Sequence, residues 1–200
     1  MTARRVLREA DLPGLHFKMP ELCGIDEAGR GPLAGPVCAA AVILPENFPF
    51  GILGDSKALS PARREKAYDV IVEKALDWAI AWATCDEIGR LNILNASLLA
   101  MKRACGALAA TPTLVVVDGN RLPDLDAPTY ALIKGDSLLA PIMAASILAK
   151  VARDRVMLRL DALAPEYGFA RHKGYPTAAH RAAIKKAGPS LWARPGFSVT

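Results

Sequence analysis

The sequence has few cysteines, and their spacing argues against the common metal and disulfide arrangements. The four are Cys23, Cys38, Cys85 and Cys105, and no two of them form a C-x-x-C pair. Structural zinc sites and disulfide-stapled small domains depend on clustered cysteines, whereas these thiols lie among apolar neighbours. We therefore expect buried free thiols in a reducing compartment, which favours a cytoplasmic protein.

The sequence also lacks a long apolar run. The longest one, around residues 138–149, contains Pro141 and Ser146 and is shorter than the roughly 20 residues that cross a bilayer. The first 15 residues mix basic and acidic side chains, and no apolar stretch follows them, which does not fit a signal peptide. We expect no membrane segment.

Internal repeats and low-complexity segments are absent as well. The 200 residues, 52% of them hydrophobic, are enough for one buried core. The 25 basic residues against 20 acidic ones give a net charge of +5, which favours polyanionic partners without identifying one. We expect an N-terminal arm (residues 1–20), a main domain (21–165) and a helical C-terminal segment (166–200) packed on that domain.

Apolar periodicity predicts an α/β fold, with a mixed five-stranded sheet flanked by helices and a small helical C-terminal part. Apolar or β-branched runs between turn residues predict strands at residues 22–26, 37–44, 79–85, 113–117 and 131–133. The first two strands are close enough in sequence to form an antiparallel pair. Helical spacing predicts helices at residues 61–78, 96–108, 141–163 and 177–186.

A glycine-rich turn follows the first predicted strand. Its Gly29-x-Gly31-x-x-Ala34 pattern superficially matches a dinucleotide-binding fingerprint. That fingerprint needs a helix to begin inside the motif, but Pro32 and Pro36 flank the position and an apolar strand follows. We reject a dinucleotide site, and a Walker A phosphate loop is also absent.

Acidic residues stand at the ends of several predicted strands. Asp26 ends the first strand and Glu27 follows at once, Asp118 comes directly after the strand at 113–117, and Asp136 follows the last. Carboxylates at the ends of neighbouring strands can converge, and converging carboxylates repel unless a cation neutralises them. Oxygen ligands of this kind suit Mg²⁺ or Mn²⁺, and two such ions can promote phosphodiester cleavage.

A purely structural interpretation is open for each acid by itself. Aspartate often hydrogen-bonds a turn before glycine, and Asp118-Gly119-Asn120 is an ordinary turn sequence. The four acids together, with no histidine or cysteine beside them, favour metal binding.

Six segments, in order, resemble the motif set of bacterial ribonuclease HII. They are GIDEAGRGPLAGPV (24–37), DSKAL (55–59), DGNRLP (118–123), KGDS (134–137), AASILAKVARD (144–154) and HKGYPT (172–177). The resemblance covers most of the chain from about residue 21 to residue 188. It implies a ribonuclease H-like fold and a two-metal centre, for Mn²⁺ or Mg²⁺, held by Asp26, Glu27, Asp118 and Asp136.

The resemblance also implies a substrate and a reaction. The substrates would be RNA/DNA hybrids and duplex DNA that contains single ribonucleotides, cut on the 5′ side of a ribonucleotide to leave a 3′-hydroxyl and a 5′-phosphate. Backbone groups of Gly29, Arg30 and Gly31 would contact the ribose 2′-hydroxyl, and Tyr175 would pack near the next sugar. The 2′-hydroxyl distinguishes RNA from DNA, and glycines allow the backbone to approach it closely.

Further polar residues near these motifs are candidates for binding phosphate. The basic ones are Lys57, Lys134, Arg171, His172 and Lys173, and the hydroxyl donors are Ser137 and Ser146. The basic side chains can equally be solvated surface, and Ser146 can be a small residue for helix packing.

Other residues fit structural roles better. Asp154 lies four residues after Lys150 on one helical face, so we interpret the two as a structural ion pair rather than part of the catalytic set. Trp78, Trp82 and Trp192 fit packing roles. The C-terminal Leu-Trp-Ala-Arg-Pro-Gly-Phe-Ser departs from the His-Arg-x-Ser-Phe-like element of the resembled family, which leaves the role of the tail open.

Two other functions are alternatives. Another nuclease of the same fold, such as an exonuclease or a junction resolvase, would also use clustered acids, and a noncatalytic module would bind duplex through basic loops. The acid set argues against the noncatalytic module, because uncompensated carboxylates near phosphates weaken binding. We expect a monomer that supports ribonucleotide removal and primer clearance during replication.

Overall fold

The computed structural model describes residues 5–14, 18–54, 56 and 58–197. Its centre is a six-stranded mixed sheet in the order β1-β6-β5-β2-β3-β4. The strands are β1 (Arg5–Leu7), β2 (Leu22–Ala28), β3 (Val37–Ile43), β4 (Asp77–Ala83), β5 (Leu114–Asp118) and β6 (Thr129–Leu132). Strands β2, β3 and β4 pair antiparallel, whereas β5 joins β2, and β6 joins β5 and β1, in parallel.

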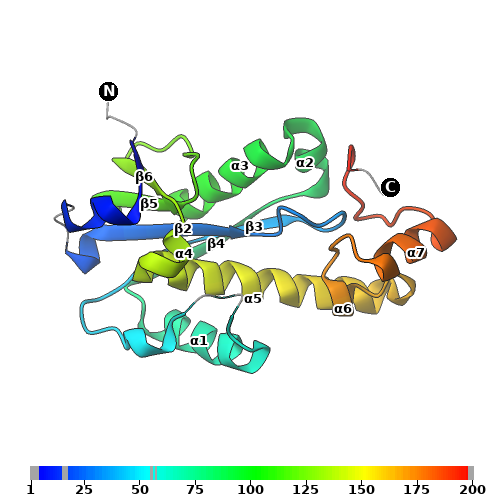
Figure 1. The fold of residues 1–200 in the computed structure, drawn as a ribbon, viewed down its shortest axis with the longest axis horizontal. Helices are drawn as coiled ribbons and strands as arrows, with labels where there is room; N and C mark the ends of the chain where they lie inside the picture. Colours follow the sequence, from blue (N-terminus) through cyan, green and yellow to red (C-terminus); the bar gives the residue numbers. More distant parts are fainter. Residues whose placement is uncertain (1–4, 15–17, 55, 57, 198–200) are drawn as a thin grey trace.

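Helices cover both faces of the sheet (Figure 1). They are α1 (Pro61–Lys74), α2 (Cys85–Leu91), α3 (Ile93–Gly106), α4 (Gly135–Leu138), α5 (Ala140–Leu163), α6 (Phe169–His172) and α7 (Ala178–Ala187). Helices α2 and α3 lie over one face, and the long α5 lies against the other face with α1 beside it. The predicted α/β class, the mixed sheet and the helical C-terminal part are confirmed.

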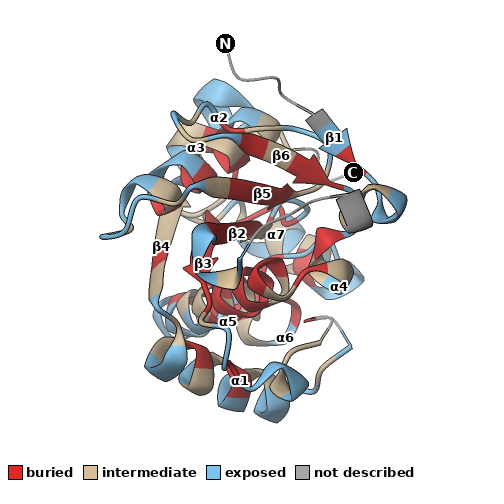
Figure 2. Cartoon of the chain, turned by 90° about the vertical axis from the view of Figure 1, so that its left-hand side faces the viewer, coloured by how far each residue is buried: buried red, intermediate tan, exposed pale blue. Residues whose placement is uncertain are grey.

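Strand β3 shows why the sheet is buried on both sides. Val37, Ala39 and Ala41 belong to the core beneath α3, whereas Cys38 and Ala40 belong to the core beneath α5. Successive side chains of a strand point to opposite faces, so an uninterrupted apolar run fits a strand covered twice. Figure 2 shows this burial through β2, β3, β5 and the inner side of α5.

The structure differs from the sequence-based prediction mainly at element boundaries. The sheet has six strands rather than five, because three residues of the predicted N-terminal arm, Arg5–Leu7, pair with β6. The helix predicted to reach Trp78 ends at Lys74, and Asp77 and Trp78 pair with β3 instead. Cys85, predicted as a strand end, begins helix α2 behind a capping box formed by Thr84 and Glu87.

The C-terminal residues pack on the distal end of α5. Met157 and Leu160 of that helix form a cluster with Tyr167, Phe169 and Ala34, and the rings of Tyr167 and Phe169 stack 5.5 Å apart. Strand β2 packs closely on the start of α5 at Gly24, where a Cβ would lie 2.2 Å from the backbone of Pro141, so the absence of a side chain permits this contact. Helix α5 therefore connects the strand ends that carry acids to the C-terminal segment.

The four cysteines are free, as predicted, with Cys23 and Cys38 buried and the other two half-buried. Within the described part of the chain, no helix combines the length and the apolar character needed to span a membrane.

Candidate metal centre and nucleic-acid site

Three acids predicted from strand ends converge in the structure. Asp26 lies in β2, Asp118 ends the parallel neighbour β5, and Asp136 lies in the first turn of α4, directly after β6. One carboxylate oxygen from each lies within 4.8 Å of the other two. Lys134 has a left-handed backbone (φ 61°), which turns the chain from β6 toward α4 and brings Asp136 to the end of β5.

The electrostatics of Asp26 indicate a site built for a cation. Its side chain is 4% exposed, and burial raises its pKa well above the usual range, with the charges of Glu27 and Asp118 adding to the effect. The hydroxyl of Ser146 and the backbone N–H of Glu27, 2.7 Å from Oδ1, oppose this rise. A bound cation would remove the repulsion between these carboxylates.

The donor set fits Mg²⁺ or Mn²⁺. The three converging groups offer only carboxylate oxygens, and hard divalent cations prefer oxygen ligands to the nitrogen and sulfur ligands that zinc usually takes. The residues present therefore fit the metal that the sequence analysis expects.

Glu27 lies at the same site in a different environment. Its Oε1 is 3.5 Å from Nη1 of Arg30, and its side chain is 12% exposed. Glu27 lines the same pocket as Asp26 and Asp118, although no oxygen of Glu27 is among the three that converge within 4.8 Å.

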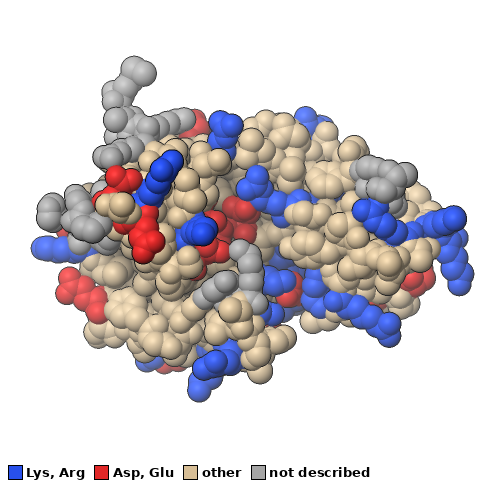
Figure 3. All heavy atoms as spheres, in the orientation of Figure 1, with Lys and Arg blue, Asp and Glu red and all other residues tan. Residues whose placement is uncertain are grey.

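The predicted sugar-reading residues share this pocket. A cavity of about 200 Å³ is lined by Asp26, Glu27, Ala28, Gly29, Arg30, Gly31, Ser56, Asp118, Ser146, Lys150, Arg153 and Tyr175. A Cβ at Gly31 would lie 3.4 Å from Cε1 of Tyr175, so the glycine turn and the tyrosine form facing sides of one slot. Acidic side chains lie near the middle of the face drawn in Figure 3, with basic side chains on both sides.

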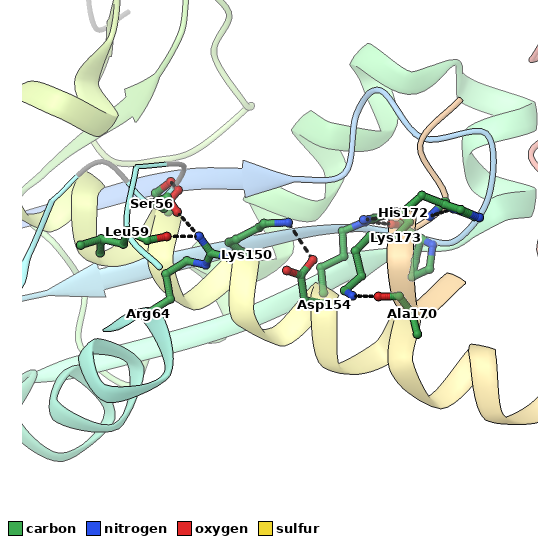
Figure 4. A network of polar contacts seen from close by, with 12 residues as sticks. Ser56, Leu59, Arg64, Lys150, Asp154, Ala170, His172 and Lys173 are labelled. Atoms are coloured by element: carbon green, nitrogen blue, oxygen red, sulfur yellow. Dashed lines mark hydrogen bonds and ion pairs between the residues drawn. The ribbon is translucent and has the colours of Figure 1, made fainter. Parts of the chain in front are cut away.

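Four pocket residues come from outside the predicted set, namely Ala28 of β2, Ser56 of the loop before α1, and Lys150 and Arg153 of α5, and the predicted Ser146 lines the same pocket. Ser56 and Ser146 share a hydrogen bond of 2.9 Å between their hydroxyls, which places both beside Asp26. Lys150 forms the predicted ion pair with Asp154 at 2.8 Å, and it also lines the pocket (Figure 4). Both Lys150 and Arg153 belong to the segment AASILAKVARD (144–154), of which the sequence analysis interpreted only Lys150, with Asp154, as a structural ion pair.

The remaining predicted phosphate ligands have other positions. His172 is buried, with Nε2 2.9 Å from the carbonyl of Tyr167 and Nδ1 accepting from the N–H of Gly174. Lys173 donates to the carbonyl of Ala170, as Figure 4 shows. Neither side chain lines the pocket, and both stabilise the turn that presents Tyr175, so their binding to phosphate stays a prediction.

Ser137 is exposed and donates to the carbonyl of Lys134 at 2.9 Å, so it too stays a prediction as a phosphate ligand. Lys57 lies outside the described residues. The carbonyls of Ser56 and Leu59 accept hydrogen bonds from Arg64, which connects these two residues to α1 (Figure 4). The tryptophans pack as predicted: Trp192 lies edge-on to Phe169 at 6.3 Å, and Trp78 donates to the carbonyl of Val72 at 3.3 Å.

Comparisons with known proteins agree with this site. The family model described as Ribonuclease HII matches residues 23–198. A ribonuclease HII of Laribacter hongkongensis is 60% identical over 169 residues, covering 84% of this chain and 85% of the relative. A ribonuclease HII of Dechloromonas aromatica is 56% identical over 186 residues, covering 93% and 95%.

A solved structure supports the same assignment for the fold. The crystal structure of the ribonuclease H2 from Pyrococcus horikoshii OT3 superposes with a TM-score of 0.76 at 27% identity, covering 89% of this chain and 94% of that one. The sheet, the flanking helices and the helical C-terminal part therefore form a ribonuclease H fold. The chain belongs to the ribonuclease HII family, whose members are divalent-metal-dependent endonucleases acting on RNA/DNA substrates.

Proposed function

We propose that the chain cleaves the RNA strand of RNA/DNA hybrids and cuts on the 5′ side of single ribonucleotides embedded in duplex DNA. One observation carries the proposal: the carboxylates of Asp26, Asp118 and Asp136 converge within 4.8 Å, and two of them, Asp26 and Asp118, line the pocket that Gly29, Gly31 and Tyr175 also line. Chemistry and sugar recognition would then take place at neighbouring points of one duplex.

The acids would hold the metal ions. Asp26, Asp118 and Asp136 would supply the shared oxygens, with Glu27 as a further ligand from the same pocket. When bound, a pair of divalent ions lowers the pKa of water and stabilises the charge that develops on the leaving oxygen. The products would be a 3′-hydroxyl and a 5′-phosphate.

The other pocket residues would bind and orient the nucleic acid. Backbone groups of Gly29, Arg30 and Gly31 would contact the 2′-hydroxyl, and Tyr175, 41% exposed, would pack against the adjacent sugar. Lys150 lines the pocket and can attract a backbone phosphate, and Ser56 and Ser146 present hydroxyls beside Asp26. His172, Lys173, Ser137 and Lys57 remain proposed contacts farther along the duplex.

The cellular role and assembly follow from the same proposal. An enzyme that cuts beside single ribonucleotides supports their removal from DNA and the clearance of RNA primers. We propose a cytoplasmic monomer for this work, using Mn²⁺ or Mg²⁺.

The test is a cleavage assay on duplex DNA that carries one ribonucleotide. With Mg²⁺ or Mn²⁺ we expect a single cut on the 5′ side of the ribonucleotide, and no cut after chelation. A matched all-DNA duplex should remain intact. Metal-dependent cutting that ignores the ribonucleotide would contradict the proposal.

The alternatives predict other products. An exonuclease needs a free end, so cutting that stops on a covalently closed substrate would favour it. A resolvase would cut at a branch, and a noncatalytic module would shift the duplex in a gel without consuming it.

A further inference from the structure

Arg194, in the C-terminal tail, is a buried arginine bound almost entirely to backbone. It is 3% exposed, and its guanidinium donates five hydrogen bonds to carbonyl oxygens. The acceptors and distances are Gly29 (2.6 Å), Arg30 (3.1 Å), Pro32 (2.7 Å), Gly35 (2.7 Å) and Pro36 (3.2 Å). All five acceptors lie in the glycine-rich turn, residues 29–36, which connects β2 to β3.

A second buried arginine approaches the same turn from α5. Arg153 is 1% exposed and donates to the carbonyls of Ala34 (3.2 Å) and Pro36 (3.0 Å). Its remaining amino group donates to the carbonyl of Lys173 at 3.1 Å. Arg153 therefore joins the glycine-rich turn to the segment that precedes Tyr175.

Backbone hydrogen bonds close the arrangement. Leu33 donates to the carbonyl of Gly174 at 2.8 Å, and Gly35 donates to the carbonyl of Trp192 at 2.9 Å. Arg194 in turn donates its backbone N–H to Leu33 at 2.9 Å. The turn is thus held between the tail on one side and the base of the Tyr175 loop on the other.

The two guanidinium groups are charged but buried, and burial disfavours charge. Among the salt bridges of the described residues, none involves either arginine. Burial, together with the nearby charge of Arg153, lowers the pKa of Arg194 to about 9. Burying an unpaired charge costs several kcal/mol, which carbonyl dipoles offset only when many of them converge with good geometry.

Apolar side chains would fill this space without that cost, so core packing alone does not explain two arginines. What the guanidinium groups provide is directional bonding, because each offers five N–H donors in a rigid planar fork. The turn contains Pro32 and Pro36, which lack N–H groups, so it cannot form a regular ladder of its own. The arginines replace that ladder and determine where each peptide group of the turn points.

The space beside Gly29 shows how closely the guanidinium of Arg153 approaches the backbone of the turn. Gly29 has a φ of 102°, and a Cβ there would lie 2.0 Å from Nε of Arg153. The peptide groups of residues 29–31 therefore rest directly on the guanidinium groups.

We propose that Arg194 and Arg153 are positioning residues for ribose recognition, holding the backbone of Gly29–Gly31 at a fixed distance from Tyr175. This inference rests on the proposed function, because it presumes that residues 29–31 contact the 2′-hydroxyl. It assigns the atypical tail a role: the tail supplies the guanidinium that shapes the sugar-reading turn. Neither arginine needs to touch the reacting phosphate.

The test measures ribose discrimination separately from folding. Single-turnover cleavage of a duplex with one ribonucleotide gives the half-saturating concentration, and a matched all-DNA duplex, added as competitor, gives an inhibition constant. The ratio of inhibition constant to half-saturating concentration reports how strongly the protein prefers the ribonucleotide. Thermal unfolding of each variant reports its stability.

For Arg194→Gln we expect the ratio to fall by roughly tenfold to a hundredfold, as when a bound geometry shifts by up to an ångström. Competition by all-DNA duplex should stay within about twofold, because phosphate contacts do not depend on the 2′-hydroxyl. Arg194→Lys keeps the charge but has fewer donors, so an intermediate ratio is expected. The matched control is Arg90→Gln, at an exposed position of α2, which should leave the ratio unchanged.

A folded Arg194→Gln protein with the wild-type ratio would overturn the inference while leaving the proposed function intact. If Arg194→Gln does not fold, Arg194→Lys decides in the same way. Wild-type protein that treats the two duplexes alike would overturn the proposed function, and this inference with it.

Discussion

The backbone N–H of Asp136 donates a hydrogen bond to Oδ1 of Asp118, with 3.3 Å between nitrogen and oxygen. The bond connects the end of β5 to the first turn of α4. The carboxylate of Asp118 is therefore oriented by the segment that supplies the third acid, before any cation arrives. A site of this kind is partly preorganised, and the ions have only to neutralise it.

The repulsion at this centre leads to a prediction for Asp26→Asn. We expect the single-turnover cleavage rate to fall on the order of 10³-fold, the effect of losing a group that organises developing charge. Because burial and two neighbouring acids raise the pKa of Asp26, the neutral amide should leave the metal-free protein as stable as wild type or more stable. Cleavage assays and thermal unfolding in chelator measure the two effects.

Duplex binding should largely survive in the Asp26→Asn variant. Asp69→Asn, on the exposed side of α1, is the matched control and should change neither quantity. Full activity of Asp26→Asn would remove this residue from the centre.

Metal binding should also stabilise the fold. At a free Mg²⁺ or Mn²⁺ concentration of about 100 times Kd, a single site adds about 2.7 kcal/mol to the free energy of unfolding. We expect the thermal midpoint of the wild type to rise with metal and to return with chelator, and we expect a smaller rise in Asp118→Asn. An equal rise of the thermal midpoint in wild type and Asp118→Asn would mean that the ion binds at a site without Asp118.

The two glycines of the turn should respond differently to alanine. Gly29→Ala places a Cβ against Arg153 at a φ of 102°, which should cost on the order of 1–3 kcal/mol of stability or more. At Gly31 a Cβ would meet only the ring of Tyr175, 3.4 Å away. Gly31→Ala should therefore fold normally and lose preference for the ribonucleotide.

Urea unfolding and the competition assay distinguish these outcomes. Mutations in the acids should lower the cleavage rate, whereas Gly31→Ala should weaken the preference for the duplex that contains a ribonucleotide. The same pattern of loss on every substrate for both classes would contradict this division of roles.

The start of α2 gives a prediction of pH dependence. Glu87 accepts two hydrogen bonds from Arg103, at 2.7 and 3.0 Å, and one from the N–H of Thr84. These bonds lower its pKa to about 2. A carboxyl with a lowered folded-state pKa contributes its full stability above the unfolded value, near 4.5, and loses it as the pH falls toward 2.

Glu87→Gln should therefore reduce the free energy of unfolding by about 1 kcal/mol at pH 7, as loss of a cap and an exposed ion pair does. The difference from wild type should shrink as the pH falls from about 4.5 toward 2, which urea unfolding at pH 7 and pH 3 can measure. Glu73→Gln, whose partner Lys74 is its neighbour on an exposed surface, should show little effect at either pH. A constant difference for Glu87→Gln would refute the assignment.

Apolar runs and turn residues predicted the elements that form from neighbouring residues, but not those that depend on long-range pairing. Strands β2, β3 and β5 follow from apolar runs, and the convergence of Asp26 with Asp118 follows from strand ends in parallel neighbours. Strand β1 was missed, because three residues give no periodicity and their pairing with β6 spans more than 120 positions. Likewise, Trp78 fits a helical pattern until β3 supplies a partner for it.

The site was predictable to the same degree. Acids at strand ends indicate metal binding, and glycines in a turn indicate close approach of the backbone to a ligand. Both could therefore be proposed from the sequence. Arg153 and Arg194 could not, because arginine is usually exposed and their acceptors in the glycine-rich turn lie 117 to 165 positions away. His172 looked like a phosphate ligand, yet its two ring nitrogens bind Tyr167 and Gly174, contacts that only the folded turn reveals.

During synthesis of the chain, Gly29 leaves the ribosome 165 residues ahead of Arg194. At the usual ~5–20 residues per second, that separation corresponds to roughly 8 to 33 s. Asp136, the last of the four acids, is made 58 residues before Arg194, so during the final part of this interval the nascent chain contains all four acids while the glycine-rich turn still lacks the guanidinium of Arg194. On the proposal made above, translation completes the set of proposed metal ligands before it supplies Arg194, and we expect the sugar-reading turn to take its final form only after the tail has packed against it.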